Sequence, residues 1–330
     1  MNQSGNPAVN APLVDNPQQI RLAMLGMVDG NGHPYSWSAI INGRYDADVL
    51  ADCGYPAIPQ YLGAQQKANL GIAGAQVTHI WCDQREDAAQ VARATFIDNV
   101  VDRPEDVIGH VDAVIIPTDV GGEHLQRARA FVEAGLPVFV DKPLTDREDD
   151  LRQFNAWWQD GRPILSTSCM RYATEFIQLR EQMQRIGEPA LIMGTMAKSW
   201  ERYGIHALES VYGLLPPGGW IRVTNTGDTD RNIVHLTHDA GVDVVLAVGK
   251  ALTGGFGHVT VTGTKDTVRA SFTDTFTAFK TQLVTFVEYL RSGAMPFPPA
   301  ETIEQMKIII AGLRSREQHG RTVDLSEIQV

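Results

Sequence analysis

Two side chains far apart along the chain, a lysine and a histidine, are of the types best suited to acid–base chemistry. Lys142 lies in Asp141-Lys142-Pro143, directly after an apolar run that ends at Val140. A lysine at the carboxyl edge of a parallel sheet faces the ligand crevice, where a neighbouring positive charge would lower its pKa towards values useful for proton exchange. The alternative is an exposed lysine that follows a strand.

The histidine is His206, three residues before Glu209 in the segment Ser199 to Glu209. On a helix these two side chains share a face, so the carboxylate could orient the imidazole for proton exchange. A metal site needs further ligands, and His235 and His238 would point to opposite faces of a strand. We therefore predict no metal site, and a His–Glu pair on an exposed helix surface is the alternative to a catalytic pair.

A glycine-rich turn follows the first apolar run and contains Gly26, Gly30 and Gly32. A dinucleotide-binding turn has a second glycine two residues after the first, where the backbone approaches the pyrophosphate, and a small residue three positions further on. Val28 and Asn31 stand at these positions. Gly30 and Gly32 could still line an anion-binding turn, and the alternative is a tight turn without a ligand.

Asp83 lies at the end of the second predicted strand, where an acidic residue commonly holds the adenosine ribose. A carboxylate there favours NAD over NADP, since it repels a 2′-phosphate. A helix N-cap formed by Asp83 is an alternative that is compatible with this role. Asp83 follows Gly26 by 57 residues, whereas the usual spacing is about 20. A long segment is therefore inserted at about residues 31–76.

The inserted segment begins with His33, Tyr35 and Trp37. It leaves the carboxyl end of a strand, where open α/β sheets bind ligands, so these side chains could wall a substrate pocket. The alternative is that the aromatic residues form a small core of the insertion itself.

The elements that would position these residues fall into two series, of which the first covers residues 20–168. Short apolar runs alternate there with helix-length segments, which predicts a doubly wound parallel sheet. The predicted strands are Ile20 to Gly26, Val77 to Cys82, Asp112 to Pro117, Leu136 to Val140 and Pro163 to Ser168. The predicted helices are Asp87 to Ala94, Glu123 to Ala134 and Arg147 to Trp158.

The second series covers residues 169–330, where Val/Thr-rich segments joined by turns predict a large, mostly antiparallel open sheet. Asp239-Ala240-Gly241 is a hairpin signal between two of these segments. The predicted strands are Ala190 to Ala197, Gly219 to Asn225, Asn232 to His238, Val242 to Val248, His258 to Gly263 and Thr267 to Phe272. Helices at Phe276 to Ser292 and Thr302 to His319 follow.

Composition narrows the class of protein. The 330 residues, 43% of them hydrophobic, suit about two globular domains. A formal net charge of −11 disfavours nucleic acid and anionic membranes as partners. The three cysteines are too few for a disulfide framework, and no apolar run reaches the ~18 residues of a membrane helix. Residues 1–19 lack the features of a signal peptide, so we expect a flexible tail and a cytoplasmic protein.

The order of these motifs resembles the glucose-fructose oxidoreductase / inositol dehydrogenase / MocA (Gfo/Idh/MocA) family over about Ile20 to Leu325. Asp141-Lys142-Pro143 is similar to the family's Glu-Lys-Pro tripeptide. Gly204 to Glu209 is similar to its Gly-x-His-x-x-Asp segment. The further matching segments are Asp112 to Ile116, Ala134 to Val140, Arg171-Tyr172, Val261 to Lys265, Pro298 to Glu301 and Gly320 to Leu325.

The resemblance implies a fold and an activity. The fold is an N-terminal Rossmann domain and a C-terminal α/β domain, whose open sheet would form a homodimer or homotetramer. The activity is hydride transfer between NAD, or NADP, and a carbinol or carbonyl carbon of a sugar, cyclitol or similar polyol. Lys142 would hydrogen-bond the reacting oxygen, and His206 would exchange its proton. The family carries Asp four residues before that histidine, whereas Arg202 stands here, which indicates an anionic substrate such as a sugar acid.

The remaining expected site residues divide by ligand. The cofactor is expected at Gly26, Gly30, Gly32, Asp83, Arg85, Thr118, His124 and Asp141. The substrate is expected at His33, Tyr35, Trp37, Arg171, Trp200, Tyr203 and Glu209.

Two other functions are compatible with the sequence. One is an NAD-assisted lyase or hydrolase of the same fold, which would hold its cofactor tightly without net turnover. The other is a redox-silent homologue that binds a ligand or a partner protein for regulation, which the incomplete glycine pattern would favour. The presence of both Lys142 and His206 argues against the second.

Overall fold

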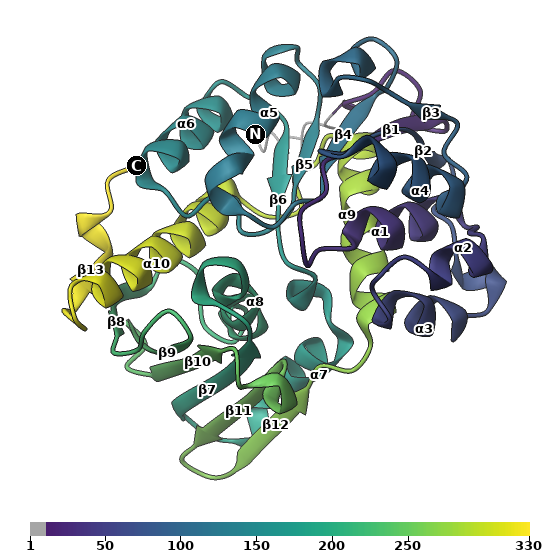
Figure 1. The fold of residues 1–330 in the computed structure, drawn as a ribbon. Coiled ribbons are helices and arrows are strands. Elements are labelled where there is room, and N and C mark those ends of the chain that lie inside the picture. The colour runs from purple at the N-terminus through teal and green to yellow at the C-terminus, as the bar shows by residue number, and fades with distance from the viewer. Residues whose placement is uncertain (1–10) are drawn as a thin grey trace, which may run out of the picture.

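The computed structural model describes residues 11–330 and contains two sheets (Figure 1). The N-terminal sheet has six strands in the order β3-β2-β1-β4-β5-β6, and all its neighbours are parallel. Its strands are β1 (Ile20–Leu25), β2 (Ala75–Trp81), β3 (Asn99–Val100), β4 (Ala113–Ile116), β5 (Val138–Val140) and β6 (Ile164–Ser166). The predicted doubly wound parallel sheet is confirmed.

Helices cover both faces of this sheet, which explains why its strands are short continuous apolar runs. The helices α1 and α4 pack together on one face, and α5 and α6 pack together on the other. Their bounds, with those of two helices in the insertion, are α1 (His33–Asn42), α2 (Ala47–Ala51), α3 (Ala57–Gly63), α4 (Arg85–Thr95), α5 (Gly121–Glu133) and α6 (Glu148–Gln159). Sequence reasoning located the insertion but did not predict α1, α2 and α3.

The connections from β1 and β4 leave the sheet in opposite directions. The chain passes from β1 through α1 to β2, and from β4 through α5 to β5. The two loops therefore diverge above adjacent strands and leave a crevice at their carboxyl ends, which is where open α/β sheets bind ligands. The loop after β1 contains residues 26–32, and the loop after β4 contains residues 117–120.

The C-terminal sheet has seven strands in the order β12-β11-β7-β10-β9-β8-β13. In this sheet, as far as residues 11–330 show, β7 and β10 are the one pair of parallel neighbours. The prediction of a mostly antiparallel sheet is therefore confirmed. The predicted hairpin joins β9 to β10. The strands are β7 (Pro189–Ala197), β8 (Trp220–Asn225), β9 (Arg231–His238), β10 (Asp243–Gly249), β11 (His258–Gly263), β12 (Thr267–Ser271) and β13 (Val323–Asp324).

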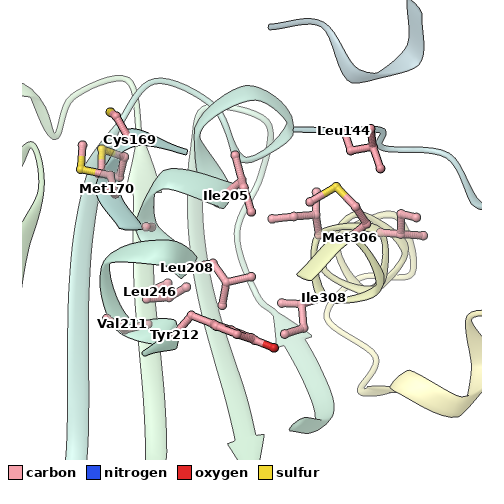
Figure 2. Packing of buried hydrophobic residues seen from close by; sticks show 14 of the residues in the cluster. Leu144, Cys169, Met170, Ile205, Leu208, Val211, Tyr212, Leu246, Met306 and Ile308 are labelled. Atoms are coloured by element: carbon pink, nitrogen blue, oxygen red, sulfur yellow. The ribbon is translucent and has the colours of Figure 1, made fainter. Parts of the chain in front are cut away.

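Helices cover one face of the C-terminal sheet. These are α7 (Thr174–Gln182), α8 (Trp200–Tyr212) and α10 (Pro299–Glu317). Figure 2 shows apolar side chains of α8, among them Leu208, between Leu246 of the sheet and Ile308 of α10. The α8 helix is therefore held on both sides, and a side chain that it presents to the crevice has a defined position.

The helix α9 (Thr275–Ser292) returns to the N-terminal sheet and packs beside α1 (Figure 1). Its Gln282 donates a hydrogen bond from Nε2 to Thr167 O at 2.6 Å. The domain boundary between residues 168 and 169 remains a prediction. The helix α9 follows this boundary in the sequence, yet it packs against the domain that precedes it.

The predicted tail, residues 1–19, lies partly outside the described residues, which begin at residue 11. In the described part, the backbone N–H of Leu13 donates to Leu290 O, and Val14 is buried in the core around α1. This part of the segment is therefore anchored to α9. Over residues 11–330, no helix has the length and apolar character needed to span a membrane.

Candidate active site

Lys142 lies directly after β5, at the carboxyl edge of the N-terminal sheet, and its side chain is 2% exposed. Its Nζ is 3.5 Å from Oδ2 of Asp119 but has no hydrogen-bond partner among the described residues. Burial lowers the pKa of Lys142, yet the carboxylates of Asp119 and Asp141 outweigh burial and raise it. Lys142 is therefore a charged hydrogen-bond donor here, and the lowering of its pKa by a neighbouring positive charge stays a prediction.

Asp119 follows β4 and is buried between two cations. Besides Lys142, it contacts Arg202 of α8, whose Nη2 donates to Asp119 Oδ1 at 2.5 Å. Burial would raise the pKa of Asp119, but the Lys142 charge and the Arg202 hydrogen bond outweigh it and lower the pKa. Sequence reasoning missed Asp119, although its position after a buried parallel strand is the signal that singled out Lys142.

His206 lies on α8 and is 5% exposed. Its Nδ1 is 2.6 Å from Oγ of Ser168, which also accepts a hydrogen bond from the backbone N–H of Met170. Burial first, and then the positive charge of Lys142, hold the pKa of His206 well below its usual value. The imidazole is therefore neutral near pH 7 and can accept a proton.

The aromatic ring of Tyr203 lies between the lysine and the histidine. Lys142 Nζ lies 4.6 Å from the centre of this ring, and the His206 ring centre is 4.8 Å from it in an edge-to-face arrangement. The structure thus brings together Lys142, Tyr203 and His206, which come from both halves of the chain, at the carboxyl edge of the N-terminal sheet.

His33, the first residue of α1, joins this group from the insertion. Its Nδ1 is 2.8 Å from Oδ2 of Asp141, and its ring stacks on Trp37 at 4.4 Å. The other oxygen of Asp141, Oδ1, is buried and has no partner within residues 11–330. Trp37 itself is buried against Phe139, so it supports the ring of His33 and has no exposed ring face for a substrate.

Glu209, Arg171 and Trp200 lie behind the site. Glu209 is buried and accepts from Ser168 N at 2.7 Å and from Arg171 Nε at 3.1 Å. Arg171 also donates to Glu301 at 2.8 Å. Trp200 is fully buried and donates from Nε1 to the backbone of α10. Because their polar atoms face protein groups, we assign these three residues to the support of α8 and Ser168.

The adenosine end of a dinucleotide has a candidate acceptor in Asp83. The N-cap of α4 is Gln84, so the alternative role of Asp83 as a helix cap is wrong. Its carboxylate instead accepts from Met27 N at 3.1 Å and from Arg127 Nη2 at 2.8 Å. A groove of about 730 Å³ lies beside it. The lining residues are Met27, Val28, Asp29, Gly30, Tyr35, Cys53, Gly54, Tyr55, Asp83, Gln84, Asp87 and Gln90.

The loop after β1 differs from a backbone cradle for phosphate. Gly26 has φ +108°, and a Cβ there would lie 2.9 Å from Thr118 Cγ2, so glycine is required for close packing. At the start of α1, His33 N donates to Asn31 Oδ1, and Tyr35 N donates to Gly32 O. Proline at position 34 has no N–H to offer. These backbone donors are therefore already used within the protein.

Thr118 and His124 connect the loops after β4 and β5. His124 is fully buried, and its Nε2 is 2.9 Å from Thr118 O. Its Nδ1 is 2.9 Å from Pro143 O, next to Lys142. Both ring nitrogens face protein oxygens, so we assign His124 to the positioning of the two loops that carry Asp119 and Lys142.

The other expected cofactor residues lie at the rim or in the loop. Arg85 is exposed and pairs with Asp102. A Cβ on Gly30 would find only Arg202 within 4 Å, whereas one on Gly32 would clash with Tyr55 of the insertion. The described residues contain no group of three or more His, Cys, Asp or Glu side chains that could hold a metal ion.

The residues thus fit a dinucleotide in part. Asp83, beside its groove, offers a ribose acceptor, and Lys142, at the carboxyl edge of the same sheet, has a donor without a hydrogen-bond partner among residues 11–330. A helix start such as that of α1 binds phosphate through free N–H groups, but those of His33 and Tyr35 are already paired. Among the described residues, the N–H groups of Val28, Asp29 and Gly30 in the loop after β1 donate to no protein acceptor, so they remain available to an anionic group.

Part of the chain is similar in sequence to known proteins. Residues 52–159 match the family described as "Oxidoreductase family, NAD-binding Rossmann fold", in agreement with the resemblance that the motifs indicate. The chain is 31% identical over 131 residues to an inositol 2-dehydrogenase of Cereibacter sphaeroides. That alignment covers 38% of this chain and 39% of the relative, so the chain spans about two fifths of the length of this curated relative.

Solved structures share the fold over nearly the whole chain. A myo-inositol 2-dehydrogenase from Lactobacillus plantarum superimposes with a TM-score of 0.73 at 15% identity, covering 94% of this chain and all of that one. GenD2 from gentamicin A biosynthesis, solved in complex with NAD, gives a TM-score of 0.71 at 17% identity, covering 93% and 96%. At these identities the similarity establishes the fold.

Proposed function

We propose that this member of the NAD-binding oxidoreductase family transfers a hydride between a nicotinamide cofactor and the carbinol or carbonyl carbon of a small polyol. One observation carries the proposal. At the carboxyl edge of the sheet, one tyrosine ring lies against a charged lysine, which has no hydrogen-bond partner within residues 11–330, and against a neutral, buried histidine. Hydroxyl oxidation needs a group that stabilises negative charge on oxygen and a group that accepts the proton.

Each side chain has a distinct role in this chemistry. Lys142 donates a hydrogen bond to the reacting oxygen and stabilises the negative charge that develops on it. His206 accepts the hydroxyl proton in oxidation and returns it in reduction, and its contact with Ser168 fixes the orientation of its ring. A bound nicotinamide cofactor would supply the hydride chemistry, as acceptor in its oxidised form and as donor in its reduced form.

We infer that NAD is preferred to NADP. The groove beside Asp83 is also lined by Asp29 and Asp87, and this group of carboxylates repels a 2′-phosphate. Arg127 neutralises part of the Asp83 charge through its bidentate contact. Hydroxyl groups of an unmodified ribose can hydrogen-bond to the remaining oxygen lone pairs of Asp83.

The substrate class follows from the same site and from the names of the relatives. Polar groups at the crevice, Lys142, Asp141 and His33, suit neighbouring hydroxyls, and the tyrosine ring suits the C–H face of a cyclitol or sugar. Arg202 gave the expectation of a sugar acid. Its guanidinium donates to the loop after β1, which is the cofactor side of the crevice, so we favour an uncharged polyol.

We also propose that the open face of the C-terminal sheet joins copies of the chain into a homodimer or homotetramer. Its outward residues include Met193 of β7 and Ile233 of β9, which are 43% and 41% exposed. An apolar surface of this kind is typical of subunit contacts. Light scattering with size-exclusion chromatography measures the assembly.

Titration with NADH, followed by energy transfer from tryptophan to the nicotinamide, tests the proposal together with a screen of polyols for NAD reduction. We expect saturable NADH binding and turnover of at least one polyol. Substitution Lys142→Met should remove turnover and retain NADH binding. Absence of binding of both NADH and NADPH contradicts the proposal and favours the regulatory alternative. Tight NAD binding with reaction but no net NADH formation indicates the lyase or hydrolase.

A further inference from the structure

Arg202 bridges the two loops that diverge at the switch point. It extends from α8, and its Nη2 lies 3.1 Å from Asp29 O in the loop after β1. The same nitrogen lies 2.5 Å from Asp119 Oδ1 in the loop after β4. The guanidinium therefore lies across the crevice in which a dinucleotide runs from the adenosine end, at Asp83, to the reactive end, at Lys142.

The guanidinium keeps donors that protein groups do not use. Its two hydrogen bonds both start from Nη2. The Nε of Arg202 is buried and has no hydrogen-bond partner anywhere in residues 11–330. A buried N–H without an acceptor is costly and uncommon. The side chain as a whole is 31% exposed, although Nε itself is covered.

The counterion of Arg202 is shared. Asp119 contacts both Arg202 and Lys142, and the neighbouring Asp141 pairs with His33. Neither cation thus has a carboxylate to itself. A guanidinium suits phosphate because its planar N–H groups match two phosphate oxygens at once.

The loop after β1 departs from the usual phosphate-binding turn in sequence. Val28 occupies the position of the glycine that lets backbone approach a pyrophosphate. The N–H groups of His33 and Tyr35, at the start of α1, donate to protein oxygens. Gly30 has φ +76°, and a Cβ added to it would lie 4.0 Å from Arg202 Nη2. The guanidinium of Arg202 thus lies beside Gly30, where the loop has no side chain.

From this geometry we propose that Arg202 binds the pyrophosphate of the dinucleotide and adds a charged donor to the loop after β1, where Val28 stands in place of the usual glycine. The inference rests on the proposed function. It also links the two halves of the molecule, because Arg202 lies one helical turn before His206 on α8. Pyrophosphate held by Arg202 would position the helix that carries the proton acceptor.

Competition binding tests this role. NADH, ADP-ribose and adenosine are compared on the wild-type protein and on Arg202→Met and Arg202→Lys, with displacement of NADH as the readout. We expect Arg202→Met to weaken NADH and ADP-ribose about tenfold or more, and adenosine, which has no phosphate, less than about twofold. Arg202→Lys should recover part of the affinity, because it keeps the charge but not the planar donor pair.

The matched control is Arg269→Met, which removes an exposed arginine from β12 and should leave all three affinities unchanged. Thermal unfolding shows whether each variant is folded. Equal NADH binding by wild type and Arg202→Met overturns this inference alone and leaves the proposed function standing. An equal loss for adenosine and ADP-ribose also overturns it, since the effect would then be structural. A wild-type protein that binds neither NADH nor ADP-ribose contradicts the proposed function and this inference together.

Discussion

Two buried groups of charged side chains lie on either side of His206, and they differ in how completely they are bonded. The Glu209 cluster consists of Arg171, Glu209 and Glu301. Hydrogen bonds join its members to each other and to Thr167 and Ser168. None of its buried polar atoms is without a partner in the part of the chain that the structure describes.

The Lys142 cluster consists of Asp119, Asp141, Lys142 and Arg202. Within residues 11–330 it contains three buried polar atoms without a hydrogen-bond partner, Lys142 Nζ, Asp141 Oδ1 and Arg202 Nε. Burial costs both clusters free energy, but only the Glu209 cluster recovers it through internal contacts. The comparison indicates that the Glu209 cluster holds the fold together, whereas the Lys142 cluster has donors and acceptors for ligands.

Removal of the Lys142 charge is the sharpest test of this difference. Lys142→Met should reduce kcat by about 10³-fold or more, because the developing charge on the reacting oxygen loses its donor. Stability should change little, since Asp119 stays paired with Arg202 and a buried charge is exchanged for an apolar group of similar length. Steady-state kinetics and urea unfolding measure the two quantities. A large loss of stability with near-normal turnover would reverse the assignment of the clusters.

The Glu209 cluster should respond in the opposite way. Glu209→Ala leaves Arg171 with only Glu301 and removes the acceptor of Ser168 N, so the free energy of unfolding should fall by about 3 kcal/mol. Urea unfolding measures this change. The control is Glu288→Ala, which removes an exposed ion pair with Arg291 and should cost less than about 1 kcal/mol. Similar losses in both variants would show that the Glu209 cluster contributes no more to stability than an exposed ion pair does.

Asp83 provides a partly exposed acid for comparison with both clusters. Asp83→Ser removes the carboxylate that repels a 2′-phosphate and frees Arg127 from its bidentate contact. The affinity for NADPH relative to NADH should therefore rise about tenfold, as measured by titration with each nucleotide. An unchanged ratio would show that Asp83 does not contact the adenosine ribose.

The pH dependence of turnover shows which cluster controls His206. The pKa of His206 is well below its usual value, through burial and the charge of Lys142. The neutral imidazole therefore persists as the pH falls through 6.5, and oxidation rates should be lost only at lower pH, where the folded protein protonates it. The pH profile of kcat/KM for polyol oxidation measures this acid limb. A limb at the ordinary histidine pKa would mean that Lys142 and burial do not act on the ring.

The same pKa shift affects stability with a definite sign. The unfolded chain protonates His206 near pH 6.5, whereas the folded chain resists protonation until lower pH. The unfolded state then binds more protons, so this residue lowers the free energy of unfolding as the pH falls below 6.5.

The candidate site could be predicted only in part. Lys142 and His206 were singled out by their positions after a strand and on a helix, and the structure places both against Tyr203. Asp119 was missed although it follows a buried parallel strand, as Lys142 does; that it contacts both Lys142 and Arg202 is decided by the tertiary structure. Trp200 and Glu209 were expected to contact substrate, yet both face the interior, since a helix pattern does not say which neighbour covers each face.

The sequence by itself determined the class of both sheets and the order of most elements. Apolar runs without alternation form strands that need helices on both faces of their sheet. Val/Thr-rich segments joined by hairpin turns form antiparallel strands. Both patterns are local properties of the chain. The tertiary structure alone decided the chemistry of the site. The pKa of Lys142 depends on whether burial or nearby carboxylates dominate, and Asp119 reaches it only because β4 and β5 are neighbours. Electrostatic interactions depend on distances in space, and the folded chain sets those distances.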